Sequence, residues 1–337
     1  MSFALADYDY DLPADRIASL PSNPRSSAKL LVFDRASGTI THGSVADLPQ
    51  FLPQQMAIII NNTRVFKARL LGKKRSGGAA ELLIIREFAG GVLAQIRAKV
   101  RVGTQLVFAE DLSAEVIETH SNGDRLVCFY ERGEPIDFAR LLEISDKIGL
   151  VPLPPYIKRS ATSEDVARYQ SCFASEIGSV AAPTASLHFD KPLLQELGSR
   201  HKIAEVTLHI GLGTFKSVET ADIRDHHIHS EHYQIGGEAA RLIDSKTPLC
   251  AIGTTACRAV EYYARSGRLN GECDLFLHPA NLPLRVGALL TNFHLPRSTL
   301  LMLVASFVGL EQTKSLYNEA IANNYRFYSY GDAMLIL

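Results

Sequence analysis

Three polar side chains stand just before an apolar block near the end of the chain. The stretch TNFHLPRSTLLML, residues 291–303, sets Asn292, His294 and Arg297 directly ahead of several leucines. The residues before it are typical of a buried strand, and a serine or threonine after it can cap a helix. Ligands bind at the carboxyl ends of strands in α/β sheets. We therefore expect Asn292 and His294 in a cleft with Arg297 at its rim. The alternative is that all three only brace a turn.

A second junction of the same kind lies about 40 residues earlier. In LCAIGTTACRAVEYY a strand is expected to end at Gly253 and a helix to begin at Thr254 or Thr255. Free amides at a helix start, together with a hydroxyl, can bind a carboxylate or a phosphate. Arg258 lies one turn further on the same side. This pattern predicts an anion site, and ordinary helix capping is the alternative.

Two further segments place a histidine beside small residues. The segment GSVAAPTASLHFD (178–190) has few long side chains before His188, which indicates backbone packed closely around something. The segment TLHIGLGTFKSV (207–218) places His209 on a strand, followed by two glycines. Its GLG is an incomplete version of the dinucleotide fingerprint, so a nicotinamide dehydrogenase is disfavoured.

A histidine cluster and a tyrosine-rich end complete the candidates. DHHIHSEHY (225–233) resembles a metal site, but it lacks HExxH spacing and any cysteine. General acid or base work by His229 or Glu231 is favoured over a metal, and His232 would lie on the other face of a strand from both. The aromatic residues of 325–337 alternate with polar ones like a closing strand pair. They suit a core, or they could flank a base or a sulfonium.

The elements that must position these groups change in kind along the chain. Residues 1–63 contain buried-type strands, and 64–148 reads as six short strands separated by turns. After 149 strands and helices alternate, which is typical of a mostly parallel α/β layer. The sequence therefore predicts an α/β fold: a discontinuous α/β layered domain, 1–63 and 149–337, with a small antiparallel β-barrel or sandwich, 64–148, inserted.

Individual elements are also predicted within the second part of the α/β domain. Helices are expected over 191–197, 238–244, 254–267 and 299–310, and strands over 204–211, 249–253 and 274–278.

Composition excludes several classes of protein. The chain of 337 residues is 46% hydrophobic and 21% charged, as in soluble globular proteins. No apolar run reaches the roughly 18 to 20 residues of a membrane span, and the N-terminus is acidic rather than basic like a signal peptide. We therefore expect a cytoplasmic protein. The five cysteines form no CxxC pair, so a disulfide framework or zinc ribbon is disfavoured.

Charge is unevenly distributed along the chain. The net charge is −1, yet residues 64–101 carry ten Lys or Arg and only Glu81 and Glu87 as acidic residues. Such asymmetry is expected of a phosphate-binding face on an otherwise acidic protein. The alternative is a solvated basic sheet with no partner.

The motifs, taken in order, resemble one family. They begin with LPxxxIA near the start and continue with NNTRVFKARLLG (61–72), VPLPPYIKR (151–159), RYQSCFA (168–174), GSVAAPTASLHF (178–189), LHIGLGTF (208–215), HIHSEHY (227–233), GTTACRAVE (253–261), TNFHLPRSTLLMLVASFVG (291–309) and YRFYSYGDAMLI (325–336). Together they resemble the S-adenosylmethionine:tRNA ribosyltransferase-isomerases of the queuosine pathway nearly end to end.

The resemblance implies a reaction and its partners. Enzymes of this family transfer the ribosyl part of S-adenosylmethionine to 7-aminomethyl-7-deazaguanine at the tRNA wobble position, in tRNAs with GUN anticodons. The product is epoxyqueuosine, and adenine and methionine are released. S-adenosylmethionine is thus a consumed substrate, and no metal, redox cofactor or membrane is implied. The implied fold, an α/β domain carrying a small β-barrel, is similar to the one predicted above.

The resemblance also implies roles for individual residues. A base must remove the acidic proton beside the sulfonium and an acid must assist the departure of adenine, and histidine can do either. The implied catalytic residues, with acid and base undecided, are His188, His209, His229, Glu231 and His294. The implied substrate-binding residues are Thr254, Thr255 and Arg258 for the methionine carboxylate, Asn61, Thr63 and Arg64 for a swung-out wobble nucleotide, and Arg25, Thr184, Thr214, Asn292, Tyr330 and Asp332.

The chain departs from the family pattern at a few positions. Asn62 stands where the family has aspartate, Ser186 where it has glycine, and the loop 278–285 is altered. Because the flanking motifs are intact, we expect the reaction to be kept. Two alternatives are a tRNA-binding protein without catalysis and an S-adenosylmethionine-dependent RNA methyltransferase.

Overall fold

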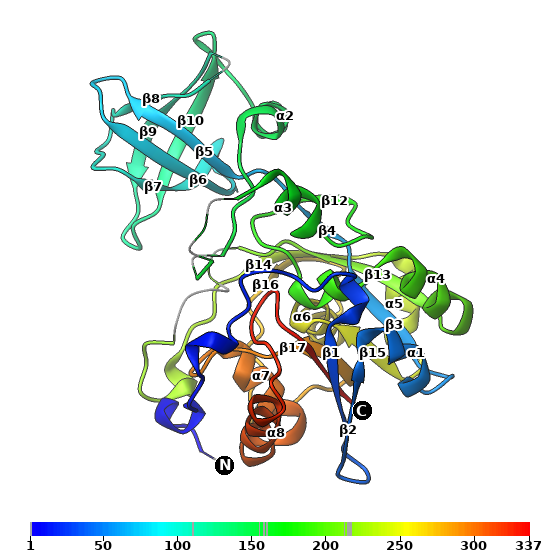
Figure 1. The fold of residues 1–337 in the computed structure, drawn as a ribbon. Coiled ribbons are helices and arrows are strands. Elements are labelled where there is room, and N and C mark those ends of the chain that lie inside the picture. Colours follow the sequence, from blue (N-terminus) through cyan, green and yellow to red (C-terminus); the bar gives the residue numbers. More distant parts are fainter. Residues whose placement is uncertain are drawn as a thin grey trace. The chain divides into compact units, whose positions relative to one another are not determined.

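The chain folds into two compact units, drawn in Figure 1. The computed structural model describes residues 2–109, 111–154, 156–157, 159, 161–211, 213 and 218–337. The sheet unit comprises Met1–Thr63, Gln170–Glu176 and Ala182–Leu337, and the barrel unit comprises Arg64–Tyr169 and Ile177–Ala181. Residues 149–169, which the sequence assigned to the α/β domain, belong to the barrel unit.

Over the described residues, one mixed sheet of nine strands organises the sheet unit. Its order is β16 (Asn270–Cys273), β14 (Glu231–Ile235), β13 (Ile203–Leu208), β3 (Ala57–Asn61), β15 (Leu249–Ile252), β17 (Val286–Asn292), β18 (Ala333–Ile336), β1 (Lys29–Asp34) and β2 (Thr39–Ser44). The four central strands, β13, β3, β15 and β17, are parallel to one another.

The expectation of a mostly parallel sheet is wrong toward both edges. Besides the central strands, only β18 and β1 pair in parallel, and the other four pairings are antiparallel. The hairpin of β1 and β2 shows the reason most simply. Only residues 35–38 connect these strands, which is too short for the crossover that a parallel pair needs.

Helices flank the sheet and largely follow the predicted positions. The α-helices of the sheet unit are α1 (Leu48–Phe51), α4 (Lys191–Arg200), α5 (Gly237–Asp244), α6 (Thr254–Ser266), α7 (Thr299–Val308) and α8 (Leu310–Ala322). The 3₁₀ helices are η1 (Leu5–Tyr8), η2 (Ala14–Arg16), η3 (Arg25–Ser27), η4 (Val45–Asp47), η5 (Thr184–His188) and η7 (Ile223–Asp225). No α-helix was predicted over α8.

Local sequence explains the ends of the helices that face the strand termini. Gly253 precedes α6 with a φ of 91°, and Gly267 ends that helix in the left-handed region with a φ of 66°. Both conformations favour glycine. Before α7, the Ser298 hydroxyl accepts a hydrogen bond from the Leu301 amide, which confirms the predicted cap.

Two strand predictions are wrong in extent, and the histidine cluster is a strand only in part. The segment 274–278 forms no strand, and the edge strand β16 ends just before it at Cys273. In the histidine cluster, regular pairing begins only at Glu231. The tyrosine-rich end forms one strand, β18, rather than a pair.

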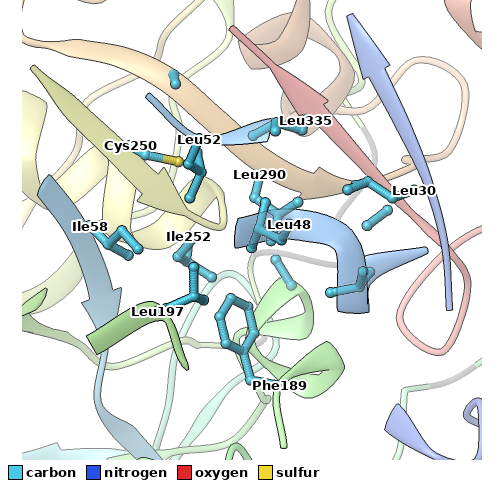
Figure 2. Packing of buried hydrophobic residues seen from close by; sticks show 14 of the residues in the cluster. Leu30, Leu48, Leu52, Ile58, Phe189, Leu197, Cys250, Ile252, Leu290 and Leu335 are labelled. Carbon is cyan, nitrogen blue, oxygen red and sulfur yellow. The ribbon is translucent and has the colours of Figure 1, made fainter. Parts of the chain in front are cut away.

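The core of the sheet unit explains why these strands are so apolar. Every residue of β3 is buried, as expected for a strand covered on both faces. Figure 2 shows Leu48 of α1 and Leu197 of α4 in one cluster with Ile252 and Leu290 of the sheet. Phe189, directly after η5, belongs to the same cluster. The core therefore fixes η5 beside the central strands.

The barrel unit contains a closed ring of six antiparallel strands over the described residues. Around the ring they are β10 (Arg125–Glu131), β7 (Gly91–Arg97), β6 (Ala79–Phe88), β5 (Arg69–Lys74), β8 (Gln105–Val107) and β9 (Leu112–Thr119), which pairs again with β10. Closure removes exposed strand edges. The prediction of an inserted antiparallel barrel is confirmed, and the sandwich alternative is wrong.

Short elements accompany the ring. β11 (Glu134–Pro135) extends β10 as a hairpin, and the helices are α2 (Phe138–Ile148) and α3 (Ser163–Arg168). β4 (Thr63–Val65) and β12 (Glu176–Ser179) lie outside the ring. Among the helices that the structure describes, none is long and apolar enough to cross a membrane.

Candidate functional site

Four parallel strands bring the predicted polar residues to one edge of the sheet. Asn61 ends β3, His209 follows β13, Thr254 comes two residues after β15, and Asn292 ends β17. Because these strands are parallel and adjacent, their carboxyl ends lie together, which is where α/β folds bind ligands. The strand order thus gathers residues that lie more than 200 positions apart in the chain.

Asn61 braces this edge with its whole side chain. Its amide nitrogen donates to the Leu208 carbonyl and to the Thr255 hydroxyl, both at 3.0 Å. Its amide oxygen accepts from the backbone amides of Leu208 and Thr63. Asn61 therefore ties the ends of β3 and β13 to the first turn of α6, and its hydrogen-bonding groups are already used within the protein.

His209 is held in a defined orientation above that brace. Its Nδ1 lies 2.8 Å from the Thr63 hydroxyl, and its ring stacks on that of His232 with centroids 6.2 Å apart. Burial is the main cause that lowers the pKa of His209, and the nearby His232 lowers it further. His232 was not among the predicted catalytic residues, because it was expected on the opposite face of a strand from His229. The structure places it against His209 instead.

The first turn of α6 keeps its backbone amides free of side-chain caps. Thr254 and Thr255 are both buried, and among the described residues no side chain caps the helix behind Gly253. Ordinary capping therefore does not explain the two threonines. The 13-residue helix presents its positive end at the shared edge of the strands.

Arg258 does not join that helix start. Its guanidinium donates through Nε to the Leu275 carbonyl at 3.0 Å, through Nη2 to the Cys273 carbonyl at 3.1 Å, and through Nη1 to the Glu231 carboxylate. Burial lowers the pKa of Arg258, but the adjacent Glu231 and other nearby groups outweigh it and raise the pKa overall. Three of the five guanidinium N–H donors of Arg258 are thus engaged within the protein. Its expected role beside Thr254 and Thr255 stays a prediction.

Glu231 links Arg258 to a histidine. The Nε2 atom of His229 lies 3.2 Å from Glu231 Oε1, and the Gly211 amide donates to the same oxygen at 3.1 Å. A side chain at Gly213 would overlap the His229 ring. The second glycine of the GLG motif thus leaves room for an imidazole, a role that the dinucleotide fingerprint did not suggest.

His188 occupies a small hollow on another side of the strand ends. It is 4% exposed at the end of η5, and the adjacent Asn292 side chain acts to raise its pKa. Burial lowers the pKa of His188 to about 4, and the Asp332 charge opposes this shift. His188, Arg25 and Tyr330 line the hollow together.

His294 is enclosed rather than accessible. Its Nε2 lies 2.8 Å from the Thr291 hydroxyl, and its backbone amide donates to the Tyr317 hydroxyl. Burial lowers the pKa of His294 to about 3. The Arg297 side chain, about half exposed, pairs with Asp9, which agrees with a place at the rim.

Three of the remaining predicted residues belong to the sheet unit. Arg25 donates to the Leu187 carbonyl at 3.2 Å, and Asp332 accepts from the backbone amides of Lys29 and Arg326; both support the hollow of His188. Thr184 is half-buried at the start of η5.

Two predicted residues, Arg64 and Thr214, remain. Arg64 is exposed in the barrel unit, and Thr214 lies outside the residues that the structure describes. In the part of the chain that is described, no group of three or more His, Cys, Asp or Glu is arranged to hold a metal ion.

Comparison with known proteins decides the family. A family model described as "Queuosine biosynthesis protein" matches residues 5–336. The chain belongs to this family. The resemblance read from the motifs is thereby confirmed.

Relatives in the queuosine biosynthesis protein family match nearly end to end. The chain is 51% identical over 333 residues to a protein of Aliarcobacter butzleri and 52% identical over 334 residues to one of Sulfurimonas denitrificans, covering 98% of this chain and of each relative. Both are named S-adenosylmethionine:tRNA ribosyltransferase-isomerase. The crystal structure of S-adenosylmethionine tRNA ribosyltransferase from Thermotoga maritima is 31% identical, with a TM-score of 0.55, and covers 98% of this chain and 100% of that one.

The departure at Asn62 from the queuosine biosynthesis protein pattern has a local explanation. The Asn62 amide nitrogen donates to the Glu205 carboxylate at 3.0 Å, and its oxygen accepts from the Thr207 hydroxyl at 2.8 Å. An ionised aspartate could not donate to Glu205 and would repel it. Ser186 is fully buried, and its hydroxyl has no partner within the described residues.

Proposed function

We propose that the protein transfers and isomerises the ribosyl moiety of S-adenosylmethionine onto 7-aminomethyl-7-deazaguanine at the wobble position of tRNAs with GUN anticodons. The products are epoxyqueuosine in the tRNA, free adenine and free methionine. S-adenosylmethionine is a consumed substrate, and the proposal needs no metal or redox cofactor. The names of relatives about 50% identical over 98% of the chain support it. Since tRNA is the proposed substrate, we expect the protein to act in the cytoplasm.

The observation that carries this proposal is the pairing of His229 with the buried Glu231 near the strand ends. A base for the proton beside the sulfonium must become positively charged, and a carboxylate at 3.2 Å stabilises that charge. The His229 side chain is 29% exposed, although its Nε2 is buried toward Glu231, so a substrate can reach the rest of the ring. We therefore assign proton removal to His229 and the support of its charge to Glu231.

The other histidines suit different tasks. With a lowered pKa, His209 is a neutral imidazole near pH 7, and its Nδ1 is occupied by Thr63. Its Nε2 can then donate a hydrogen bond to the departing adenine. His188 and His294, with pKa values of about 4 and about 3, are poor bases near neutrality and serve to position substrate or loops.

Anion recognition supports the choice of substrate. The uncapped first turn of α6, with Thr254 and Thr255, suits the methionine carboxylate. Asn292, Arg25, Thr184, Tyr330 and Asp332 remain candidates around the His188 hollow. The remaining candidates are Asn61 and Thr63 as braces of the site, and Arg64 and Thr214 as substrate contacts.

The reaction is tested by product analysis. The purified protein is mixed with S-adenosylmethionine and a tRNA carrying 7-aminomethyl-7-deazaguanine, and adenine, methionine and the mass of the modified nucleoside are measured. Adenine, methionine and an epoxyqueuosine mass together support the proposal. S-adenosylhomocysteine with a methylated tRNA would instead mark a methyltransferase. Binding of tRNA with S-adenosylmethionine left intact would contradict catalysis.

A further inference from the structure

The basic residues of the barrel unit differ in whether they are neutralised. Three cations of the basic segment pair with carboxylates: Lys67 with Asp146, and Arg69 and Arg97 with Glu81. The two carboxylates offset most of the charge of these three cations, because Arg69 and Arg97 share Glu81. They are therefore unsuited to gripping an external anion.

Four other cations of the same segment surround one hollow. A cavity of about 630 Å³ is lined by residues 74–76 and 99–105, among them Lys74, Arg75, Lys99 and Arg101. Among the described residues, none of the four makes an ion pair, and Arg75, Lys99 and Arg101 are exposed. A concave surface with several uncompensated positive charges concentrates its field on whatever enters it.

Backbone hydrogen bonds preform this hollow. In the turn between β5 and β6, the Lys74 amide donates to the Gly78 carbonyl at 3.0 Å. In the loop before β8, the Thr104 amide donates to the Arg101 carbonyl at 2.9 Å, and the Thr104 hydroxyl accepts from the Arg101 amide. The Arg75 amide donates to the Gln105 carbonyl and so joins the two walls. The backbone that carries these charges is thus already ordered, which lowers the cost of binding.

The chemistry of the lining selects the kind of anion. The hollow contains Ser76, Thr104 and Gln105 besides the cations, and no aromatic residue of the described part of the chain lines it. Reading single-stranded bases requires aromatic rings or groups on base edges, whereas Lys, Arg and hydroxyl groups bind phosphates without regard to sequence. The lining therefore suits a phosphate backbone rather than bases.

We propose that this hollow, called the phosphate grip, binds the sugar–phosphate backbone of the tRNA substrate through Lys74, Arg75, Lys99 and Arg101. The inference rests on the proposed function for the identity of the RNA. It locates the contact at four residues within the basic segment 64–101. The grip supplies affinity that depends on salt and is independent of the anticodon.

The test compares two double variants that remove equal charge from the same barrel. Lys99→Gln with Arg101→Gln removes two cations of the phosphate grip. The matched control, Arg97→Gln with Arg132→Gln, removes two exposed cations that already pair with Glu81 and Asp111. Unchanged unfolding midpoints verify that both variants fold.

The measurements are tRNA affinity between 50 and 200 mM salt and the kinetics of adenine release. For the grip variant, we expect the slope of log affinity against log salt to fall by about 2, one for each lost phosphate contact. The KM for tRNA should rise at least tenfold with kcat unchanged, and a tRNA with an unrelated anticodon should lose affinity equally. The control variant should change the slope by less than half as much.

Three outcomes would overturn the inference: unchanged tRNA affinity in the grip variant, equal losses in both variants, or a loss confined to one anticodon. If the wild-type protein binds tRNA through the grip but releases no adenine, the proposed reaction fails while the grip stands. If adenine is released and the grip variant behaves as wild type, only the grip fails.

Discussion

Glu231 and Arg258 form a buried ion pair, with the guanidinium Nη1 against Oε2 and each residue about 3% exposed. Two backbone carbonyls accept hydrogen bonds from the guanidinium Nε and Nη2. The second carboxylate oxygen lies 3.2 Å from His229 Nε2. The pair therefore fixes an ionised carboxylate beside a partly exposed histidine.

Removing one charge of this pair should destabilise the protein. Glu231→Gln leaves Arg258 buried without a counter-charge, and we expect a loss of about 3 kcal/mol in the free energy of unfolding. Urea unfolding measures it. Glu231→Gln combined with Arg258→Met removes both charges and should restore most of the stability but not adenine release. A double variant as unstable as the single one would contradict this account.

Replacement of His229 should affect the reaction and not the fold. For His229→Gln we expect kcat for adenine release to fall between about 10² and 10⁴-fold, as general-base removal typically does, with the unfolding midpoint nearly unchanged. The control is His227→Gln, two residues away and exposed, which should keep wild-type turnover. Equal turnover in the two variants would remove His229 as the base.

The two glycines of the GLG motif provide a steric test. Gly213→Ala places a methyl group into the His229 ring, so we expect a displaced imidazole and at least a tenfold lower kcat. Gly211→Ala meets nothing within 4 Å and keeps the amide that donates to Glu231, so it should be nearly neutral. The kinetics of adenine release distinguish them. Comparable losses in both variants would contradict a specific contact between Gly213 and His229.

Buried histidines predict how stability depends on pH. Burial lowers the pKa of His294 to about 3 from its ordinary 6.5. Between these two pH values the unfolded chain binds a proton at His294 and the folded chain does not. Stability is then fully present above about pH 6.5 and falls as the pH drops toward 3. His294→Gln should be less stable at pH 7 but should lose less between pH 6.5 and 4. Unfolding midpoints across this range measure it, and parallel pH profiles would refute the assignment.

Much of the fold could be predicted because its signals are local. The apolar run ending at Ile60, the serine cap at Ser298 and the glycine before α6 act over a few residues. The six short strands of the barrel were likewise visible from alternation and turns. Edge strands were predicted less well, because pairing there depends on which neighbour is within reach. The strand expected at 274–278 was wrong for this reason.

The sequence by itself determined the family, the strand and helix junctions and the basic character of residues 64–101, since motifs, caps and charge are properties of neighbouring residues. Only the tertiary structure decided the partners. Arg258 meets Glu231, and His232 stacks on His209. Strand order brings these distant residues together, and hydrogen-bonding capacity is limited, so a donor engaged by one partner is not available to another.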